Sequence, residues 1–289
     1  MTMASNESSR PVPARTASVD RLTLRDPIFV SDLHLCAQRP RTAQRFFGLL
    51  EDIAGHAAEL VILGDLFEYW AGDDALRSVG SKSEDQDGTD DDRVGQQVAQ
   101  ALRQLGSRGT AVYLMHGNRD VLLGSDFLEQ SGAQLLADPA LATIGASSSG
   151  ASGLATLLAH GDAYCTLDLP YQAFRRQARD AQSQSFFLAQ PLAVRRKLIG
   201  QARERSEAGK QQLSMKIMDV TPDAIDQALR GAGVRHIIHG HTHRPARHEF
   251  SLDGAPAVRW VLPDWDQDTT PPRGGGLRWL DGALAPLPL

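Results

Sequence analysis

The chain has 289 residues, 42% of them hydrophobic and 22% charged, which is an ordinary balance for a globular protein. Its formal net charge of −5 argues against nucleic acid as a partner, because a polyanion-binding protein needs a basic surface. The only two cysteines, Cys36 and Cys165, lie far apart, which predicts no disulfide and a reducing, cytoplasmic location. No apolar run reaches the roughly 18–20 residues that span a bilayer, so any membrane contact is expected to be peripheral.

Residues 1–25 are rich in Ser, Arg and Pro and predict a disordered N-terminal arm. After the arm, short apolar runs alternate with longer helical stretches such as 41–58 and 92–106. The runs, each expected to form a strand buried on both faces, are Ile28–Val30, Leu60–Leu63, Ala111–Leu114, Leu154–Ala159 and Val234–Ile238. This alternation predicts an α/β sandwich with its functional residues at the carboxyl ends of the strands.

Three stretches read as insertions into this core, which is expected to comprise residues 26–164 and 221–289. Residues 80–93 contain six acidic residues and predict a solvated loop, and residues 145–153, made of Gly, Ala and Ser, predict a flexible linker. Residues 165–220 are mostly helix-forming and carry ten Lys or Arg against five Asp or Glu. They predict a helical cap over the mouth of an active site.

Polar clusters follow the predicted strands, one cluster to each strand. They are Asp32-Leu33-His34, Gly64-Asp65, Gly117-Asn118-Arg119-Asp120, His160-Gly161-Asp162 and Gly240-His241-Thr242-His243. Side chains two residues apart on extended chain share a face, so Asp32 and His34 can reach one ion together. Each motif alone is weak, since a lone His is usually structural and a lone Gly-Asp is usually a turn. Five such motifs in order, each following a predicted strand, predict that their side chains converge on one edge of the sheet.

The donor types in these clusters favour a borderline-hard divalent ion. Carboxylate, imidazole and amide oxygens suit Mn²⁺, and the absence of a cysteine cluster argues against structural zinc. Asp65 is the best candidate to bridge two ions, because each of its oxygens can serve one of them. Asn118 supplies a neutral oxygen, which leaves net positive charge to attract a phosphate and to lower the pKa of a bound water. Asp120 is expected to orient neighbouring backbone or His160 instead of binding metal.

These motifs resemble those of the calcineurin-like metallophosphoesterase superfamily over residues 28–265. The resemblance is closer to its subfamily of UDP-2,3-diacylglucosamine pyrophosphatases. The stretches that carry it are Ser31–Leu35, Leu63–Asp74, His116–Asp120, Tyr171–Arg175, Ile217–Val220 and His239–Pro245. Arg119 is informative, because many members of the superfamily carry a histidine there, and an arginine suits a diphosphate clamp.

The resemblance implies a four-layer α/β/β/α core with a helical cap, two Mn²⁺ ions per chain, and a set of site residues. Asp32, His34, Asp65 and His243 would hold one ion, and Asp65, Asn118, His160 and His241 the other. Asp65, Arg119 and His241 would be catalytic. Substrate contacts would come from Asn118, Arg119, Asp168, Ser206, Lys210 and His241. The subfamily often has a lysine in the cap where this chain has Leu213.

The implied reaction is hydrolysis of UDP-2,3-diacylglucosamine to UMP and 2,3-diacylglucosamine 1-phosphate, a step of lipid A biosynthesis. Two rivals stay open: hydrolysis of a soluble nucleotide or other phosphoester, and a non-catalytic lipid-binding role. The cap also has two interpretations. Its apolar residues either pack only on one another or line a chamber for two acyl chains, with basic residues at positions 175, 176, 179, 195 and 196 facing an anionic inner-membrane surface. The oligomeric state is not predicted.

Overall fold

A single curled β-sheet forms the centre of the molecule. The computed structural model describes residues 19–78, 88–146, 153–210 and 219–288, without the side chains of Val19, Ser78 and residues 204–210. Within these residues the strand order is β11-β10-β2-β3-β4-β5-β6-β7-β9-β8, with β1 paired to β5 beside this path. The strands are β1 (Val19–Leu24), β2 (Pro27–Val30), β3 (Glu59–Leu63), β4 (Ala111–Met115), β5 (Gln134–Ile144), β6 (Leu154–Ala159), β7 (His236–His239), β8 (Ala246–Leu252), β9 (Ala255–Val261), β10 (Gly276–Leu280) and β11 (Ala283–Leu287).

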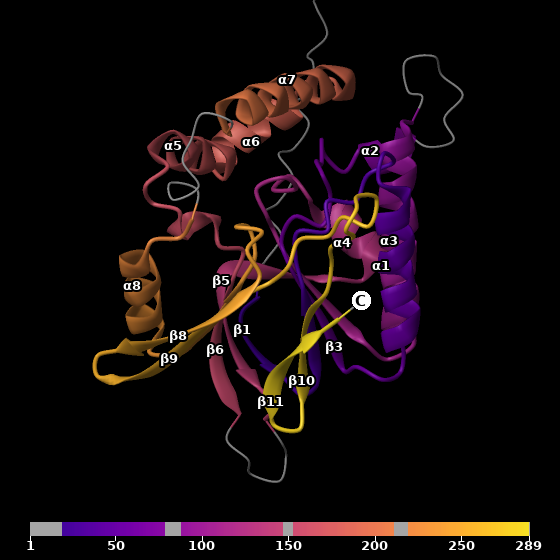
Figure 1. Ribbon diagram of the computed structural model, residues 1–289. Helices are drawn as coiled ribbons and strands as arrows, with labels where there is room; N and C mark the ends of the chain where they lie inside the picture. Colours follow the sequence, from indigo (N-terminus) through magenta and orange to yellow (C-terminus); the bar gives the residue numbers. More distant parts are fainter. Residues whose placement is uncertain (1–18, 79–87, 147–152, 211–218, 289) are drawn as a thin grey trace, which may run out of the picture.

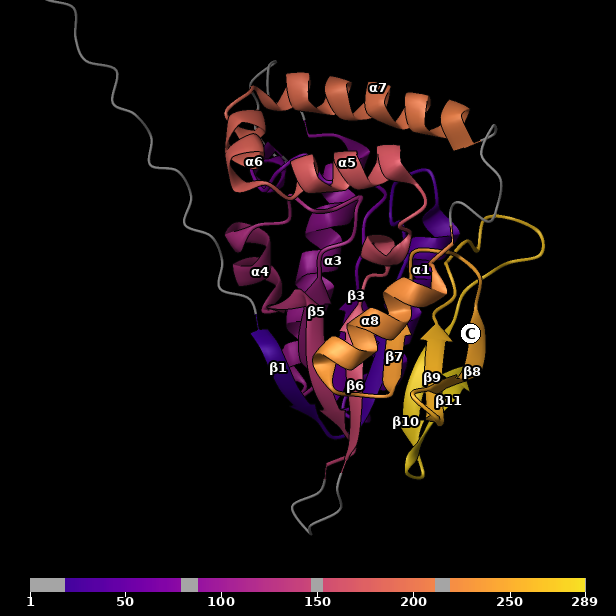
Figure 2. The ribbon, with the colours of Figure 1, turned by 90° about the vertical axis from the view of Figure 1, so that its left-hand side faces the viewer.

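Helices cover both outer faces of the curled sheet and one of its ends (Figures 1 and 2). They are α1 (Pro40–Ile53), α2 (Ala75–Ser78), α3 (Asp90–Ser107), α4 (Ser125–Ser131), α5 (Leu169–Ala178), α6 (Ala181–Leu188), α7 (Leu192–Lys210) and α8 (Pro222–Ala232). Helices α1, α3 and α4 lie on one side, α8 lies on the other, and α5, α6 and α7 lie together across the top. These last three are called the cap helices below.

The layers follow from strands that are apolar on both faces. Phe29 of β2 and Val61 and Leu63 of β3 are fully buried in the core between the two halves of the sheet. Their neighbours along the same strands, such as Val30 and Ile62, point outward and pack under α1 and α3. A third cluster lies between α8 and strands β6 to β9. The predicted four-layer α/β/β/α architecture and the double-sided burial of these strands are therefore confirmed.

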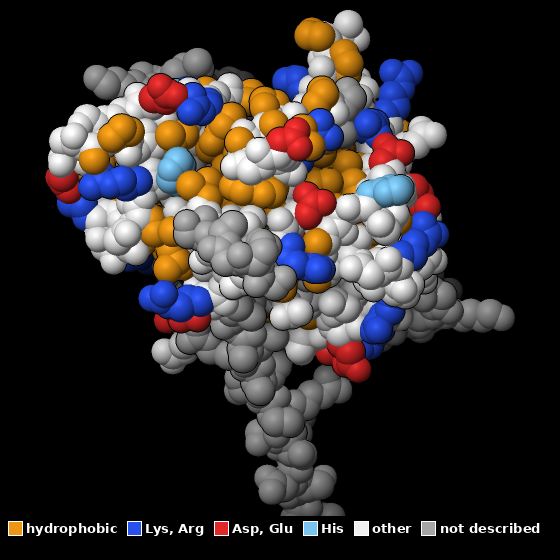
Figure 3. Space-filling model, turned by 90° about the horizontal axis from the view of Figure 1, so that it is seen from below, with side chains coloured by type: hydrophobic (Ala, Val, Ile, Leu, Met, Phe, Trp, Pro, Cys, Tyr) orange, Lys and Arg blue, Asp and Glu red, His pale blue; other side chains and the backbone are white. Residues whose placement is uncertain are grey.

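Hydrophobic side chains also gather on the underside of the molecule, opposite the cap helices (Figure 3). Partly buried side chains also pack against the core between the two sheet halves. They are Leu22, Tyr113, Leu154, Trp260, Trp279 and Leu284.

The prediction is wrong at the C-terminal ends of two segments, the expected arm and the expected acidic loop, where the structure has a strand and a helix. Within the expected arm 1–25, Val19–Leu24 forms β1, because alternating Leu22 and Leu24 face the core while the strand pairs with β5. Within the expected acidic loop 80–93, α3 begins at Asp90. Thr89 caps it, accepting a hydrogen bond from the Asp92 amide while the Asp92 side chain accepts from the Thr89 amide. Residues 1–18 and 80–87, and most of the linker 145–153, lie outside the described residues.

Candidate metal centre

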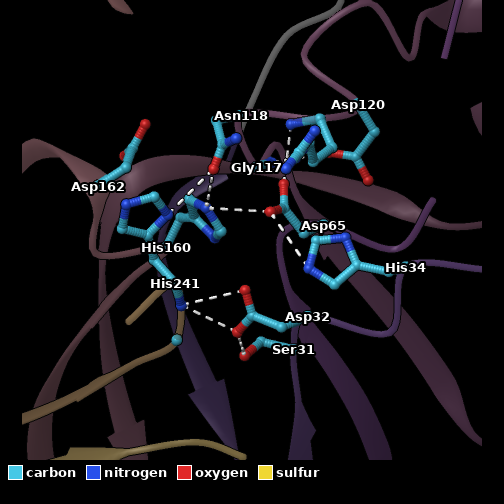
Figure 4. Close-up of polar contacts among 12 residues, drawn as sticks. Ser31, Asp32, His34, Asp65, Gly117, Asn118, Asp120, His160, Asp162 and His241 are labelled. Atoms are coloured by element: carbon cyan, nitrogen blue, oxygen red, sulfur yellow. Dashed lines mark hydrogen bonds and ion pairs between the residues drawn. The ribbon is translucent and has the colours of Figure 1, made fainter. Parts of the chain in front are cut away.

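The predicted clusters meet at one edge of the sheet, as Figure 4 shows. Strands β2, β3 and β4 run parallel, as do β6 and β7, so their carboxyl ends lie close together. The side chains brought together there are Asp32 and His34 after β2, Asp65 after β3, Asn118 after β4, His160 after β6, and His241 and His243 after β7. Residues separated by up to 211 positions in sequence thus form one site.

The backbone of this edge adopts an unusual conformation. Five of the seven candidate ligands have a left-handed backbone with φ between 48° and 68°: Asp32, His34, Asp65, His241 and His243. Elsewhere in the described part of the chain, the non-glycine residues with positive φ are Asp253 and Asp281, each directly before a glycine in a hairpin turn. Left-handed backbone costs a non-glycine residue about 1–3 kcal/mol, and such strain concentrates at functional sites.

Asp32, His34 and His243 form the first group of donors, with ligand atoms all within 4.8 Å of one another. The Nε2 atoms of His34 and His243 lie 3.4 Å apart, and Nε2 of His243 lies 3.5 Å from Oδ1 of Asp32. Two imidazole nitrogens and a carboxylate thus point at one small volume. Such a set suits a divalent cation.

The second group comprises Asp65, His160 and His241, again with ligand atoms within 4.8 Å. The side-chain oxygen of Asn118 joins this group, 3.1 Å from Nε2 of His160 and 3.0 Å from Nδ1 of His241. The Nδ1 atom of His160 lies 2.9 Å from the Leu63 carbonyl oxygen and donates to it, which leaves Nε2 as the nitrogen with a lone pair for the site.

Asp65 lies between the two groups. Its Oδ2 is 3.8 Å from Nε2 of His34 and 3.8 Å from Nε2 of His160. One carboxylate therefore faces both donor sets, which is the position that a bridging ligand requires. The residues present thus fit a centre for divalent cations.

The charge around the site also favours a cation. Burial opposes protonation of His160, yet the Asp65, Asp162 and Asp32 carboxylates raise its pKa to about 9. Burial likewise opposes ionisation of Asp32, but the hydrogen bond and charge of His243 hold the pKa of Asp32 below its usual range. The buried carboxylates thus create a negative potential that positive charge relieves.

Glycines and Asp120 shape the loops that carry the donors. A Cβ on Gly117 would lie 2.0 Å from Oδ1 of Asp65, so no larger residue fits there. Asp120 accepts hydrogen bonds from the amides of Leu66 (2.7 Å) and Gly117 (2.8 Å), which ties the loop after β3 to the loop after β4. Of the two expected roles, Asp120 therefore takes that of orienting backbone. Burial, with the nearby Asp65, raises the pKa of Asp120 to about 6.

The predicted substrate contacts lie in three different surroundings. The backbone amide of Arg119 donates to Oδ1 of Asp65 (2.9 Å), which anchors this residue at the site. Asp168 caps α5, accepting a hydrogen bond from the amide of Tyr171 (3.0 Å). Ser206 and Lys210 lie in α7 where side chains are outside the described ones, and Leu213 lies outside the described residues altogether.

Glu68 and Tyr171 are parts of the site that sequence reasoning missed. The Glu68 carboxylate lies 3.2 Å from Nδ1 of His34 and 3.8 Å from the Arg119 guanidinium. Burial opposes its ionisation, but His34, Arg119 and Arg203 lower its pKa to about 2. The Tyr171 ring lies 5.6 Å from the His241 ring, measured between centroids, and its hydroxyl donates to Asp162 (2.8 Å). Both residues fall in the stretches that carried the resemblance, but nothing in their spacing indicated these contacts.

The expected orientation of the cap arginines toward a membrane is wrong for four of the five. Arg175 and Arg179 both pair with Asp138 and Asp162, Arg195 pairs with Asp74, and Arg196 pairs with Asp92. All four carboxylates belong to the core, so these arginines attach the cap helices to it. Arg176 is the exposed member of the set.

Comparisons with known proteins agree with this geometry. The family model for calcineurin-like phosphoesterases matches residues 28–245. A protein of Cellvibrio japonicus (strain Ueda107) named UDP-2,3-diacylglucosamine hydrolase is 44% identical, the match covering 82% of this chain and 90% of the relative. Proteins of the same name from Chromohalobacter salexigens and Aromatoleum aromaticum are also 44% identical, covering 89% and 91% of this chain and 94% and 96% of the relatives. The chain belongs to the calcineurin-like phosphoesterase family and is a hydrolase of that family.

Proposed function

We propose that this protein hydrolyses UDP-2,3-diacylglucosamine to UMP and 2,3-diacylglucosamine 1-phosphate, a step of lipid A biosynthesis. The observation that carries the proposal is the pair of donor groups that share Asp65. The names of the relatives at 44% identity supply the substrate. Asp32, His34, Asp65 and His243 would hold one Mn²⁺, and Asp65, Asn118, His160 and His241 the other.

In this reaction a water oxygen bonds to one phosphorus, and the P–O bond between the two phosphates breaks, leaving its electron pair on the departing phosphate. Two bound divalent ions would supply a polarised water and offset negative charge on the phosphoryl oxygens. Arg119, tethered to Asp65 through its amide, is positioned to pair with the diphosphate. His241 is held between Asn118 and the Tyr171 ring, an arrangement that would let its imidazole face the phosphate. The departing phosphate is a fair leaving group, so no dedicated general acid is required.

The cap helices would bind the lipid part of the substrate. We assign residues 165–220 to this cap, residues 19–164 and 221–289 to the core, and substrate contacts to Asn118, Arg119, Asp168, Ser206, Lys210 and His241. Six large hydrophobic side chains in residues 165–200 are exposed: Leu167, Leu169, Phe174, Phe186, Val194 and Leu198. These support contact with acyl chains and with a membrane surface.

The membrane contact would be peripheral, on the cytoplasmic face of the inner membrane. Among the described residues, no helix combines the length and the apolar character needed to cross a bilayer. Cys36 and Cys165 are both buried free thiols, which accords with a reducing compartment.

The test is UMP release from UDP-2,3-diacylglucosamine in detergent with Mn²⁺, using wild type, Asp65→Ala and Asp281→Asn. Asp65→Ala should lose more activity than the roughly 10–100-fold that removal of an outer-shell partner costs. Asp281→Asn, at another left-handed carboxylate far along the chain, should retain full activity. Near-normal turnover by Asp65→Ala would refute the metal assignment. Turnover of soluble nucleotides alone would favour the first rival, and no turnover of any substrate would favour the lipid-binding one.

A further inference from the structure

Glu68 contacts both the loop after β2 and cap helix α7. It lies in the loop after β3, and its amide donates to the Leu35 carbonyl (3.2 Å) in the loop after β2. The side chain is largely buried, with 7% of the residue exposed. One carboxylate oxygen lies 3.2 Å from Nδ1 of His34, and the other accepts a hydrogen bond from Arg203 of α7 (2.6 Å).

The contact between Glu68 and His34 fixes which nitrogen of the His34 ring faces the other members of the first donor group. Nε2 of His34 points at His243 and Asp65, while Nδ1 points away from them at Glu68. A carboxylate at Nδ1 keeps the proton on that nitrogen and leaves the Nε2 lone pair for a cation. It also restrains rotation of the ring, which lies on strained backbone.

The contact with Arg203 brings the cap into the same arrangement. Arg203 lies over the Tyr69 ring, 5.7 Å from its centroid, and donates to Glu68. Glu68 and Arg203 line a cavity of about 450 Å³ between α7 and the core. Because this cavity leaves room around the pair, conservative changes at either residue can be made without overpacking.

We propose that Glu68 is a positioning residue that couples docking of cap helix α7 to the geometry of the first donor group, through His34. This inference rests on the metal-dependent function proposed above. When Arg203 is in place, Glu68 is held against His34 and Arg119, and the donor group is complete. When α7 moves away, Glu68 loses the cation that holds one of its oxygens, and His34 is less restrained.

Mn²⁺ binding to metal-free protein, measured by calorimetric titration, tests the inference independently of turnover. Glu68→Gln keeps the size of the side chain but loses its charge. It should weaken one of the two Mn²⁺ affinities about tenfold or more and leave the other unchanged. Excess Mn²⁺ should restore its turnover. Arg203→Met should weaken the same affinity by a smaller factor and speed amide exchange in α7.

Lys197→Met is the matched control, because it makes the same kind of substitution at an exposed cation of the same helix. It should leave both Mn²⁺ affinities unchanged. The inference would be overturned if Glu68→Gln bound both Mn²⁺ ions as tightly as wild type. It would also be overturned if Arg203→Met did so although amide exchange in its α7 was faster. Should Glu68→Gln fail to fold, Arg203→Met alone decides. Absence of Mn²⁺-dependent turnover in wild type would instead refute the proposed function.

Discussion

At the scale of single residues, the site depends on close approach between loops, and Gly240 is the sharpest case. A Cβ at this position would lie 2.1 Å from Oγ of Ser31 and 2.2 Å from Oδ2 of Asp32, far inside van der Waals contact. The Gly240→Ala variant should therefore displace Asp32, lowering Mn²⁺ affinity and turnover about tenfold or more while the fold persists. Calorimetric titration and circular dichroism measure the two effects.

Gly231→Ala is the control for that variant. Gly231 lies in α8, and nothing lies within 4 Å of the Cβ it would gain. This change should keep turnover and stabilise the protein by about 0.5–1 kcal/mol, because alanine favours the helix. If Gly240→Ala bound Mn²⁺ as tightly as Gly231→Ala, the close approach would have no role in the site.

His116 predicts an acid-sensitive stability. Burial, assisted by Arg179, lowers its pKa from 6.5 to about 4, although Nε2 donates to the Leu123 carbonyl (2.7 Å). Between pH 6.5 and 4 the unfolded chain binds a proton at this residue that the folded chain does not. The contribution of His116 to the free energy of unfolding is therefore fully present above pH 6.5 and is lost as the pH falls toward 4. From pH 7 to pH 5 the loss from this histidine should be about 2 kcal/mol.

Urea unfolding of metal-free protein at pH 7 and pH 5 measures this loss. His116→Gln keeps a hydrogen-bond donor but cannot titrate, so its free energy of unfolding should fall about 2 kcal/mol less than that of wild type. Other buried histidines, such as His239 with its pKa lowered to about 3 by burial, contribute equally to both proteins. Equal pH dependence in the two proteins would show that His116 titrates normally.

At the scale of elements, α7 is attached to the core by arginines. Arg195 is 1% exposed and donates to the Ala71 carbonyl and to Asp74. The Asp74 carboxylate is half exposed, but Ala71 is buried, and a buried carbonyl that loses its donor costs roughly 1–3 kcal/mol. Arg195→Met should therefore speed amide exchange in α7 while exchange in α1 and α3 stays unchanged. Lys197→Met, an exposed change on the same helix, should have no effect. Slower or unchanged exchange in Arg195→Met would show that apolar packing alone holds α7.

The sequence predicted the central strands well and the peripheral ones poorly. Strands β2, β3 and β4 contain continuous apolar runs, and burial on both faces makes that pattern conspicuous, while β6 and β7 keep it around Thr156 and His236. The hairpins β8–β9 and β10–β11 went unpredicted, although Asp253-Gly254 and Asp281-Gly282 occupy their turns with positive φ. Asp-Gly between strands is a known hairpin pattern. Strand β8 is mostly exposed and polar, so its sequence lacks the apolar run.

At the scale of the whole molecule, the convergence of the seven candidate ligands could be foreseen because parallel strands end at one edge. The ion pairs between the cap arginines and the core could not be foreseen, since they join segments that are distant in sequence. The cap carries a surplus of five positive charges in an acidic protein. That surplus is balanced in large part by the core carboxylates Glu68, Asp74, Asp92, Asp138 and Asp162. Local charge alone does not reveal whether a basic helix faces a membrane or its own core.

This charge balance predicts how the protein binds membranes. With four arginines paired internally, vesicle binding should depend on the exposed apolar side chains of the cap and only weakly on salt. Raising NaCl from about 0.1 to 0.5 M, which shortens the Debye length, should therefore release little protein from phosphatidylethanolamine–phosphatidylglycerol vesicles. The double variant Phe186→Ser and Leu198→Ser should bind about tenfold more weakly, since a partly inserted Phe and Leu together contribute about 1.4 kcal/mol or more.

Leu280→Ser is the control, because Leu280 is the exposed large hydrophobic residue of β10, away from the cap helices. It should bind vesicles as wild type does. Co-sedimentation with vesicles in the absence of substrate measures all three proteins. If salt released the wild type while the double variant still bound, charge would dominate after all. The ion pairs of Arg175, Arg179, Arg195 and Arg196 would then have to open at the membrane, and variants that break them individually would bind more tightly than wild type.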